Sequence, residues 1–188
     1  MPILPAKLSH GPFSIEIARS VGVSYAQLRF WLKKGLIEQR ERGIFQAAGD
    51  DYNEEEIFRS ALTRVGDPSV ICSLSALVYY QLTDEIPRQT WIMVPKVKRS
   101  KHTDLRLIRV ANLQLEIGIV TISGFRITSL ERTLIEAIVK PRYVGKILGI
   151  QALKQALAEK KTTLNAVINM ASQLGVLKRL LPVIEVLL

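Results

Sequence analysis

The sequence predicts an α+β protein, and three observations support this prediction. Apolar residues recur at helical spacing over residues 14–34. Short apolar segments, separated by glycine or by charged turns, follow at 36–45 and again at 90–128. From residue 129 onward the helical spacing returns, interrupted by threonine and proline. With 188 residues, of which 48% are hydrophobic, the chain can form one ordinary domain or two small ones.

The first expected elements are two helices joined by a tight turn. Ser14 can cap a helix that runs to about Ser20, and Ser24 can cap a second one. Gly22 lies between them and tolerates the positive φ that a tight corner requires. Gly35 stands where the second helix is expected to end.

The second helix has an apolar stripe and a polar, basic opposite face. Leu28, Trp31 and Leu32 recur at the spacing of one buried helical stripe. The opposite face carries the residues Tyr25, Gln27, Arg29, Phe30, Lys33 and Lys34.

A hairpin is expected directly after the second helix. The apolar pairs Leu36-Ile37 and Ile44-Phe45 bracket a charged tip, with Gly43 at the turn. Helix, turn, helix and hairpin together are the layout of a winged helix-turn-helix, which we assign to residues 1–47. The segment before Ser14 leaves room for only a short leading helix.

This block predicts binding to double-stranded DNA. A helix fits the major groove, and residues near its N-terminus reach the base edges. Tyr25, Gln27 and Arg29 are therefore the candidates for base contacts, whereas the phosphate contacts are expected from Lys33, Lys34, Arg40 and Arg42. The alternatives are an ordinary solvated face, or a helix-turn-helix that binds only protein.

Charge divides the chain into two basic parts and an acidic connector. The net charge is +9, which favours acidic partners such as nucleic acid, an anionic membrane surface or an acidic protein. Residues 1–46 carry +4, residues 47–68 carry −4 and residues 69–188 carry +9. We therefore expect an acidic linker helix within 48–68, capped by Asn53, and a separate α+β effector domain over 69–188.

The C-terminal domain is expected to hold a small, mostly antiparallel sheet and a helical end. A buried helix is expected over 71–82, with strands at 90–95, 105–110, 115–122 and 125–128. A basic turn, 96–104, separates the first two strands. Helices are then expected from a cap at Thr128 or Ser129 to Lys140, and over 145–160, 163–174 and from 176.

The C-terminal domain shows no catalytic pattern. His10 and His102 have no partner at the spacing of zinc ligands, and no phosphate-binding or nucleophile motif is present. Glu116, Glu131 and Glu136 fit helix-surface glutamates better than a nuclease site, and Cys72 fits a small buried apolar residue. We therefore expect no enzyme, no catalytic residue, no metal and no cofactor.

A cluster of basic residues is the one candidate site in this domain. From Arg88 to Arg109 the sequence contains seven Lys or Arg residues and a single acidic residue, Asp104. We assign this cluster to DNA support or to an acidic partner, with simple solubility as the alternative. The candidate site residues among the seven are Lys96, Lys98, Arg99, Lys101, Arg106 and Arg109.

Neither a membrane-spanning run nor a secretory signal is visible in the sequence. We therefore expect a cytoplasmic protein with no membrane partner.

The order of several segments resembles the AbiEi-type antitoxins and related transcriptional regulators of type IV toxin–antitoxin (abortive infection) systems. The resemblance covers about residues 12–185. The segments that carry it are GVSYAQLRFWLKKGLIEQRERGIF, ICSLSALVYYQLTDEIPRQTWIMVP, LRLIRV and ITSLERTLIEAI.

The resemblance implies a protein with two roles. The N-terminal domain would repress its own operon, and the C-terminal domain would counter a nucleotidyltransferase-like toxin without needing a stable complex. Arg132 and Thr133 match an Arg-Thr pair of the family, and we interpret them as structural. The implied operator contacts are Ser24, Tyr25, Gln27, Arg29, Lys33, Lys34, Arg40 and Arg42.

Two other functions remain as alternatives. One is a stand-alone winged-helix transcription factor whose C-terminal domain dimerises or binds a small ligand. The other is a nucleic-acid enzyme guided by the helix-turn-helix.

Overall fold

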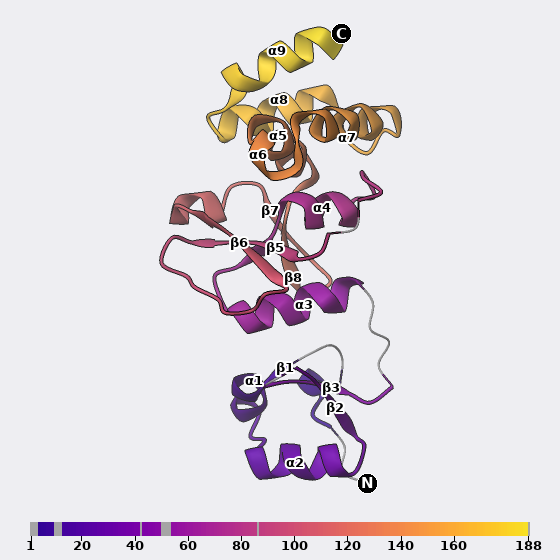
Figure 1. Cartoon of the computed structure of the whole chain (residues 1–188), viewed down its shortest axis with the longest axis vertical. Coiled ribbons are helices and arrows are strands. Elements are labelled where there is room, and N and C mark those ends of the chain that lie inside the picture. Colours follow the sequence, from indigo (N-terminus) through magenta and orange to yellow (C-terminus); the bar gives the residue numbers. More distant parts are fainter. Residues whose placement is uncertain (1–3, 10–12, 42, 50–53, 86, 188) are drawn as a thin grey trace. The chain divides into compact units, whose positions relative to one another are not determined.

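The computed structural model shows a mixed α+β protein with two small sheets, as the sequence predicts (Figure 1). It describes residues 4–9, 13–41, 43–49, 54–85 and 87–187, and only the main chain at 40, 41, 112, 113, 186 and 187. The chain divides into two compact units, Met1–Asp67 and Pro68–Leu188. Each unit is described below by itself.

The first unit contains short helices around a three-stranded antiparallel sheet. The strand order is β1-β3-β2, and Phe13 of β1 pairs with Phe45 of β3. The sequence did not predict β1, because two residues give no alternation to recognise. The elements are η1 (Ala6–Leu8), β1 (Phe13–Ser14), α1 (Ile15–Ser20), α2 (Tyr25–Lys33), β2 (Ile37–Glu41), β3 (Ile44–Ala47) and α3 (Glu54–Val65).

Local hydrogen bonds fix both ends of α2. The Ser24 hydroxyl accepts from the Gln27 backbone N–H at 3.2 Å, and the Gln27 side chain accepts from the Ser24 backbone N–H at 3.0 Å. This reciprocal pair is a capping box. At the other end the Leu36 N–H donates to the Trp31 carbonyl and Gly35 has a φ of +65°, which together form a Schellman motif.

The helix expected as a linker belongs to the first unit, because the boundary between the units falls after Asp67. Helix α3 begins at Glu54, and the expected cap, Asn53, lies outside the described residues. A buried polar contact joins α3 to the sheet. Gln46 of β3, fully buried, donates from its side-chain amide to the carboxylate of Glu56 at 3.0 Å. Burying a carboxylate requires such a partner.

The second unit is built on a five-stranded mixed sheet of order β6-β5-β4-β8-β7. Two of its pairings, β5 with β6 and β4 with β8, are parallel, and the other two are antiparallel. The prediction of a mostly antiparallel sheet was therefore wrong. The strands are β4 (Val70–Ile71), β5 (Thr90–Pro95), β6 (Leu105–Val110), β7 (Ile119–Ile122) and β8 (Phe125–Thr128).

The connection between β5 and β6 explains this error. Residues 96–104, which we call the basic strap, do not form a hairpin tip; they return along β5 so that β6 runs parallel to it. Six strand residues span roughly 20 Å, a distance that nine extended residues can cover. The strap is tied down at both ends, where Lys98 N–H donates to the Pro95 carbonyl at 3.0 Å and Thr90 N–H donates to the Asp104 carbonyl at 2.8 Å.

The helix expected over 71–82 is shorter than predicted. Val70 and Ile71 form β4, the central strand, and helix α4 runs only over Ser73–Tyr79, after Cys72. A continuous apolar run does not distinguish a buried strand from a buried helix. Pairing with both β5 and β8 gives Val70 and Ile71 their extended conformation.

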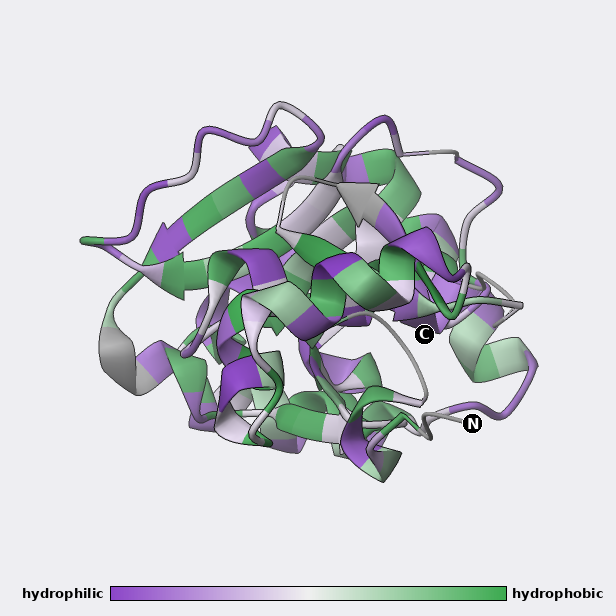
Figure 2. Cartoon of the chain, turned by 90° about the horizontal axis from the view of Figure 1, so that it is seen from below, coloured by the Kyte–Doolittle hydropathy of each residue, from purple (hydrophilic) through white to green (hydrophobic). Residues whose placement is uncertain are grey.

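Helices cover one side of this sheet and make up the C-terminal part of the unit (Figure 1). Figure 2 shows hydrophobic and hydrophilic residues interspersed along the helices of the chain. Within the described ranges, no helix has the length and apolar character needed to cross a membrane. The remaining elements are η2 (Asn112–Leu115), α5 (Leu130–Val139), α6 (Pro141–Val144), α7 (Lys146–Ala158), α8 (Leu164–Gln173) and α9 (Leu177–Leu187).

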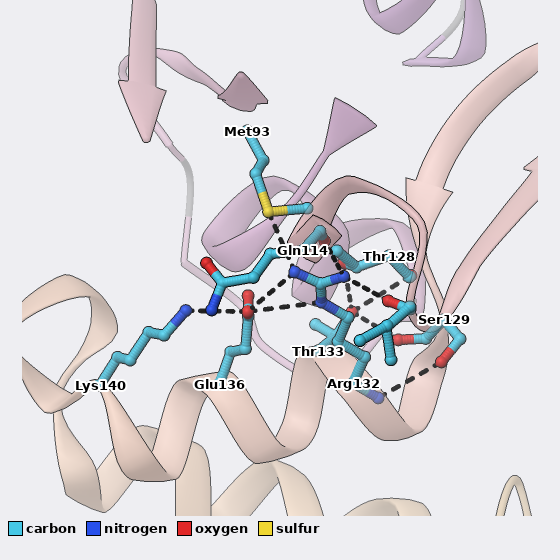
Figure 3. A network of polar contacts seen from close by, with 9 residues as sticks. Met93, Gln114, Thr128, Ser129, Arg132, Thr133, Glu136 and Lys140 are labelled. Atoms are coloured by element: carbon cyan, nitrogen blue, oxygen red, sulfur yellow. Dashed lines mark hydrogen bonds and ion pairs between the residues drawn. The ribbon is translucent and has the colours of Figure 1, made fainter. Parts of the chain in front are cut away.

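Arg132, at the first turn of α5, joins that helix to the sheet (Figure 3). The side chain is fully buried and donates to the carbonyls of Gln114, at 2.6 Å, and Ile117. It also forms an ion pair with Glu136 at 3.2 Å and contacts the sulfur of Met93 at 3.1 Å. The structural role expected of Arg132 is therefore confirmed.

Candidate nucleic-acid interface

The exposed face of α2 is the main candidate site. Leu28 and Trp31 are buried against the core of the first unit, which fixes the rotation of the helix. At about 3.6 residues per turn, Tyr25, Arg29 and Lys33 form a single row along the exposed side. Burial of the apolar stripe thus aligns two cations and a phenol in one line.

This row borders a groove between α2 and the β2–β3 hairpin. The groove has a volume of about 990 Å³. Gln39 of β2 and Phe45 of β3 line the hairpin side, and Leu28 and Leu32 of α2 contribute the apolar part of the lining. Helix and hairpin therefore present one continuous surface rather than two separate charged faces.

The α2 residues that the sequence predicts to contact DNA are not all equally available for such a contact. Tyr25, Arg29 and Lys33 line the groove together. Gln27 is exposed, but its side-chain oxygen is used in the capping box with Ser24. Lys34 lies on the flank of the helix, where its ammonium is 5.9 Å from the centre of the Phe30 ring.

The hairpin residues expected to meet phosphates are described only in part. Arg42 lies outside the described residues, and Arg40 is described in its main chain alone. The pairing register shifts between Gln39 and Glu41, so Arg40 occupies a β-bulge near the turn. Gly43 lies in the turn and has a φ of +83°.

Two groove residues, Phe30 and Gln39, were not among the predicted contacts. Both are exposed and line the groove. The helical pattern does place Phe30 on the exposed face, so its position opposite the apolar stripe is the signal that identifies it. Gln39 has no such signal, because the hairpin register is needed to place it.

The six basic residues of the second unit do not form a single patch. Arg106 and Arg109 are three positions apart on β6, so their side chains leave opposite faces of the sheet. Arg106 stacks over the Trp91 ring, with its guanidinium carbon 4.0 Å from the ring centre. Arg109 instead donates to the Lys98 carbonyl of the basic strap at 3.1 Å.

One cation of the basic strap, Arg99, forms hydrogen bonds within the strap. Arg99 donates to the carbonyls of Lys96, at 2.9 Å, and Lys98, at 3.1 Å. Lys96 and Lys101 are exposed, whereas Lys98 is partly buried. The strap therefore exposes Lys96 and Lys101 and holds Arg99 against its own backbone.

Tyr143 also belongs to the group formed by Arg106 and Trp91, and the sequence did not predict this. Tyr143 of α6 meets Trp91 edge-on, with ring centres 6.2 Å apart. The guanidinium of Arg142 lies 4.8 Å from the Tyr143 ring centre. Arg142 and Tyr143 are far from Trp91 in sequence, so only the packing of α6 against the sheet joins them to this group.

The described residues contain no group of three His, Cys, Asp or Glu side chains that could hold a metal ion. His102 is exposed, and His10 lies outside the described residues. Cys72 is buried, as predicted. Burial, reinforced by the nearby Glu136 carboxylate, raises the pKa of the Cys72 thiol far above its ordinary value.

Comparison with solved structures shows a likeness of fold. The crystal structure of the RV2827C protein from Mycobacterium tuberculosis matches with a TM-score of 0.55 and 14% sequence identity. The match covers 86% of this chain and 66% of that chain, so this chain spans just under two thirds of its length. No protein-family model matches the sequence, and no curated protein matches it.

Proposed function

We propose that the protein is a DNA-binding transcriptional autorepressor and an antitoxin of a type IV toxin–antitoxin system. Its first unit would act as a winged helix-turn-helix. The observation that carries this proposal is the row of Tyr25, Arg29 and Lys33, which lines a groove bounded by the hairpin.

In this proposal α2 enters the major groove of the protein's own operator. Tyr25 and Arg29, in the N-terminal half of the helix, reach base edges, and a bidentate arginine selects guanine. Lys33 and Lys34, near the C-terminal end, meet phosphates and fix the register without reading sequence. The hairpin, with Arg40 and Arg42, meets the adjacent backbone. A repressor of this kind works in the cytoplasm, where the operator is.

A gel-shift titration with DNA from upstream of the protein's own gene tests the repressor role. Arg29→Ala should lower the preference for that DNA over random DNA by about 1–3 kcal/mol. Lys33→Ala should weaken binding to both DNAs alike and reduce the slope of log K against log salt by about 0.9. Lys154→Ala, an exposed cation on α7, is the matched control and should change neither quantity. Unchanged binding by a triple Arg29→Ala, Lys33→Ala, Lys34→Ala variant would overturn the assignment of α2.

The antitoxin role rests on the resemblance of the ordered segments to AbiEi-type proteins. Its test is co-expression of the full chain with a nucleotidyltransferase-like protein encoded beside it. We expect the full chain to restore growth, and we expect the triple α2 variant to restore it equally. Failure of both to restore growth would favour the stand-alone transcription factor instead.

The salt dependence of DNA binding and the rescue of growth also test the role of the exposed strap lysines, Lys96 and Lys101. A lower salt slope for a Lys96→Ala, Lys101→Ala variant would place these lysines on DNA, at about 0.9 per phosphate. An unchanged slope with loss of growth rescue would place them in the antitoxin role. Metal-dependent cleavage of DNA or RNA by the purified protein would favour the enzyme alternative.

A further inference from the structure

Phe30 is an apolar residue in the middle of the basic face of α2. Its side chain is 49% exposed, whereas Leu28 and Trp31 of the same helix are buried. At about 100° per residue, Phe30 projects between Lys33 and Lys34, almost opposite the buried stripe. It therefore points away from the core at the centre of the proposed DNA-binding surface.

Packing within the described part of the first unit does not account for an aromatic ring at this position. Among the described residues, the apolar cluster of the first unit does not include Phe30. The Lys34 ammonium, 5.9 Å from the ring centre, is a cation–π contact at an exposed site, which contributes little. Phenylalanine also has a lower helix propensity than alanine, so neither packing nor helix formation explains an aromatic ring here.

The position of the ring in the groove indicates what it meets. Phe30 lines the same groove as Arg29, Lys33 and Gln39, all of which carry hydrogen-bonding groups. In the major groove the C5-methyl group of thymine is the one bulky apolar group among the polar donors and acceptors of the base edges. The exposed apolar ring beside these polar side chains matches that methyl group and gains free energy by burying it.

We propose that Phe30 is a specificity-determining residue that recognises the C5-methyl group of thymine in the operator. This inference rests on the proposed function, because it requires α2 to lie in the major groove. It adds a preference for an A·T base pair beside the base that Arg29 contacts.

Replacement of thymine by uracil in the DNA tests this inference, because the change removes the methyl group and retains base pairing. The probe is duplex DNA from upstream of the protein's own gene, prepared with either thymine or uracil throughout. We expect the wild-type chain to bind the uracil duplex about fourfold more weakly for each methyl group that Phe30 buries. Phe30→Ala should bind the thymine duplex more weakly than wild type and should not distinguish the two duplexes.

Two further variants separate the role of the ring from other effects. Phe30→Leu keeps an apolar side chain and should retain part of the thymine preference. Arg29→Ala should weaken binding to both duplexes and keep their ratio. Equal binding of the two duplexes by the wild-type chain, or an unchanged ratio in Phe30→Ala, would overturn the inference while leaving the proposed function standing. Absence of any preference for the upstream DNA would instead overturn the proposed function.

Discussion

The side-chain oxygen of Gln27 accepts a hydrogen bond from the backbone N–H of Ser24 at 3.0 Å. A residue predicted to reach a base therefore also closes the first turn of α2. The reciprocal bond from the Gln27 backbone N–H to the Ser24 hydroxyl, at 3.2 Å, completes the box. The same two residues thus decide where the proposed DNA-binding helix begins.

The first prediction concerns this capping box. Ser24→Ala should lower the free energy of unfolding by about 1 kcal/mol, because it leaves a helix-terminal N–H without an acceptor. Gln27→Ala should also lower the free energy of unfolding. It should not change the preference for operator DNA over random DNA. Gln27→Glu keeps the box and should restore stability. Urea unfolding and gel shifts measure the two effects separately, and a loss of base preference in Gln27→Ala would show that Gln27 contacts a base.

The second prediction concerns the buried cation of α5. Arg132→Met should lower the free energy of unfolding by about 3–5 kcal/mol, since it leaves the Gln114 and Ile117 carbonyls without their donor and Glu136 with only one cation. Lys140, 2.9 Å from the Glu136 carboxylate, is the cation that remains.

Graded substitution tests whether the arginine geometry matters. Arg132→Lys retains the charge but lacks the planar fork, so it should recover only part of the lost stability. Thermal or urea unfolding measures the series. Full stability in Arg132→Met would contradict the structural role of this network.

The third prediction concerns the close approach of α7 to α5. A Cβ atom at Gly149 would lie 2.8 Å from the carbonyl carbon of Ala137, part of the α5 backbone. Helix propensity alone favours Gly149→Ala by about 1 kcal/mol, but overpacking costs about 1–3 kcal/mol. We expect net destabilisation, because a backbone neighbour cannot move aside as a flexible side chain can.

An exposed position on the same helix supplies the control. Lys154→Ala also introduces an alanine into α7, at an exposed position and with little change in helix propensity, and should stay within about 0.5 kcal/mol of wild type. Urea unfolding compares the two variants. A Gly149→Ala variant more stable than wild type would show that the two helices do not pack this closely.

The fourth prediction concerns Cys72. Because burial raises the pKa of its thiol, the native protein should resist alkylation at neutral pH, whereas the unfolded chain should react fully. Labelling followed by mass measurement, with and without denaturant, tests this. Rapid alkylation of the native protein would contradict the burial of Cys72.

The same pKa shift predicts a loss of stability in alkali. Above about pH 8.5 the unfolded thiol loses its proton while the folded thiol keeps it, so the unfolded state is favoured as pH rises. The contribution is at most about 1.4 kcal/mol per pH unit. Cys72→Ala should remove that part of the slope, which unfolding measurements between pH 8 and pH 10 would detect.

Local sequence signals were sufficient for the elements that depend on near neighbours. The serine caps at positions 14, 24 and 129 and the stop at Gly35 all appear where expected, because each acts within one helical turn. Strands β5 and β6 also match their predicted bounds. The predicted exposed face of α2 follows equally from the spacing of Leu28 and Trp31.

The sequence by itself determined the α+β class, the caps and the polar face of α2, since these follow from periodicity and from hydrogen bonds between near neighbours. Only the tertiary structure decided that β5 and β6 run parallel, that Val70–Ile71 is the central strand and that Arg106 stacks on Trp91 while Arg109 donates to the Lys98 carbonyl. The physical reason is that strand direction and sheet neighbours depend on contacts between distant segments. A run of apolar or basic residues does not encode which distant segment it will meet.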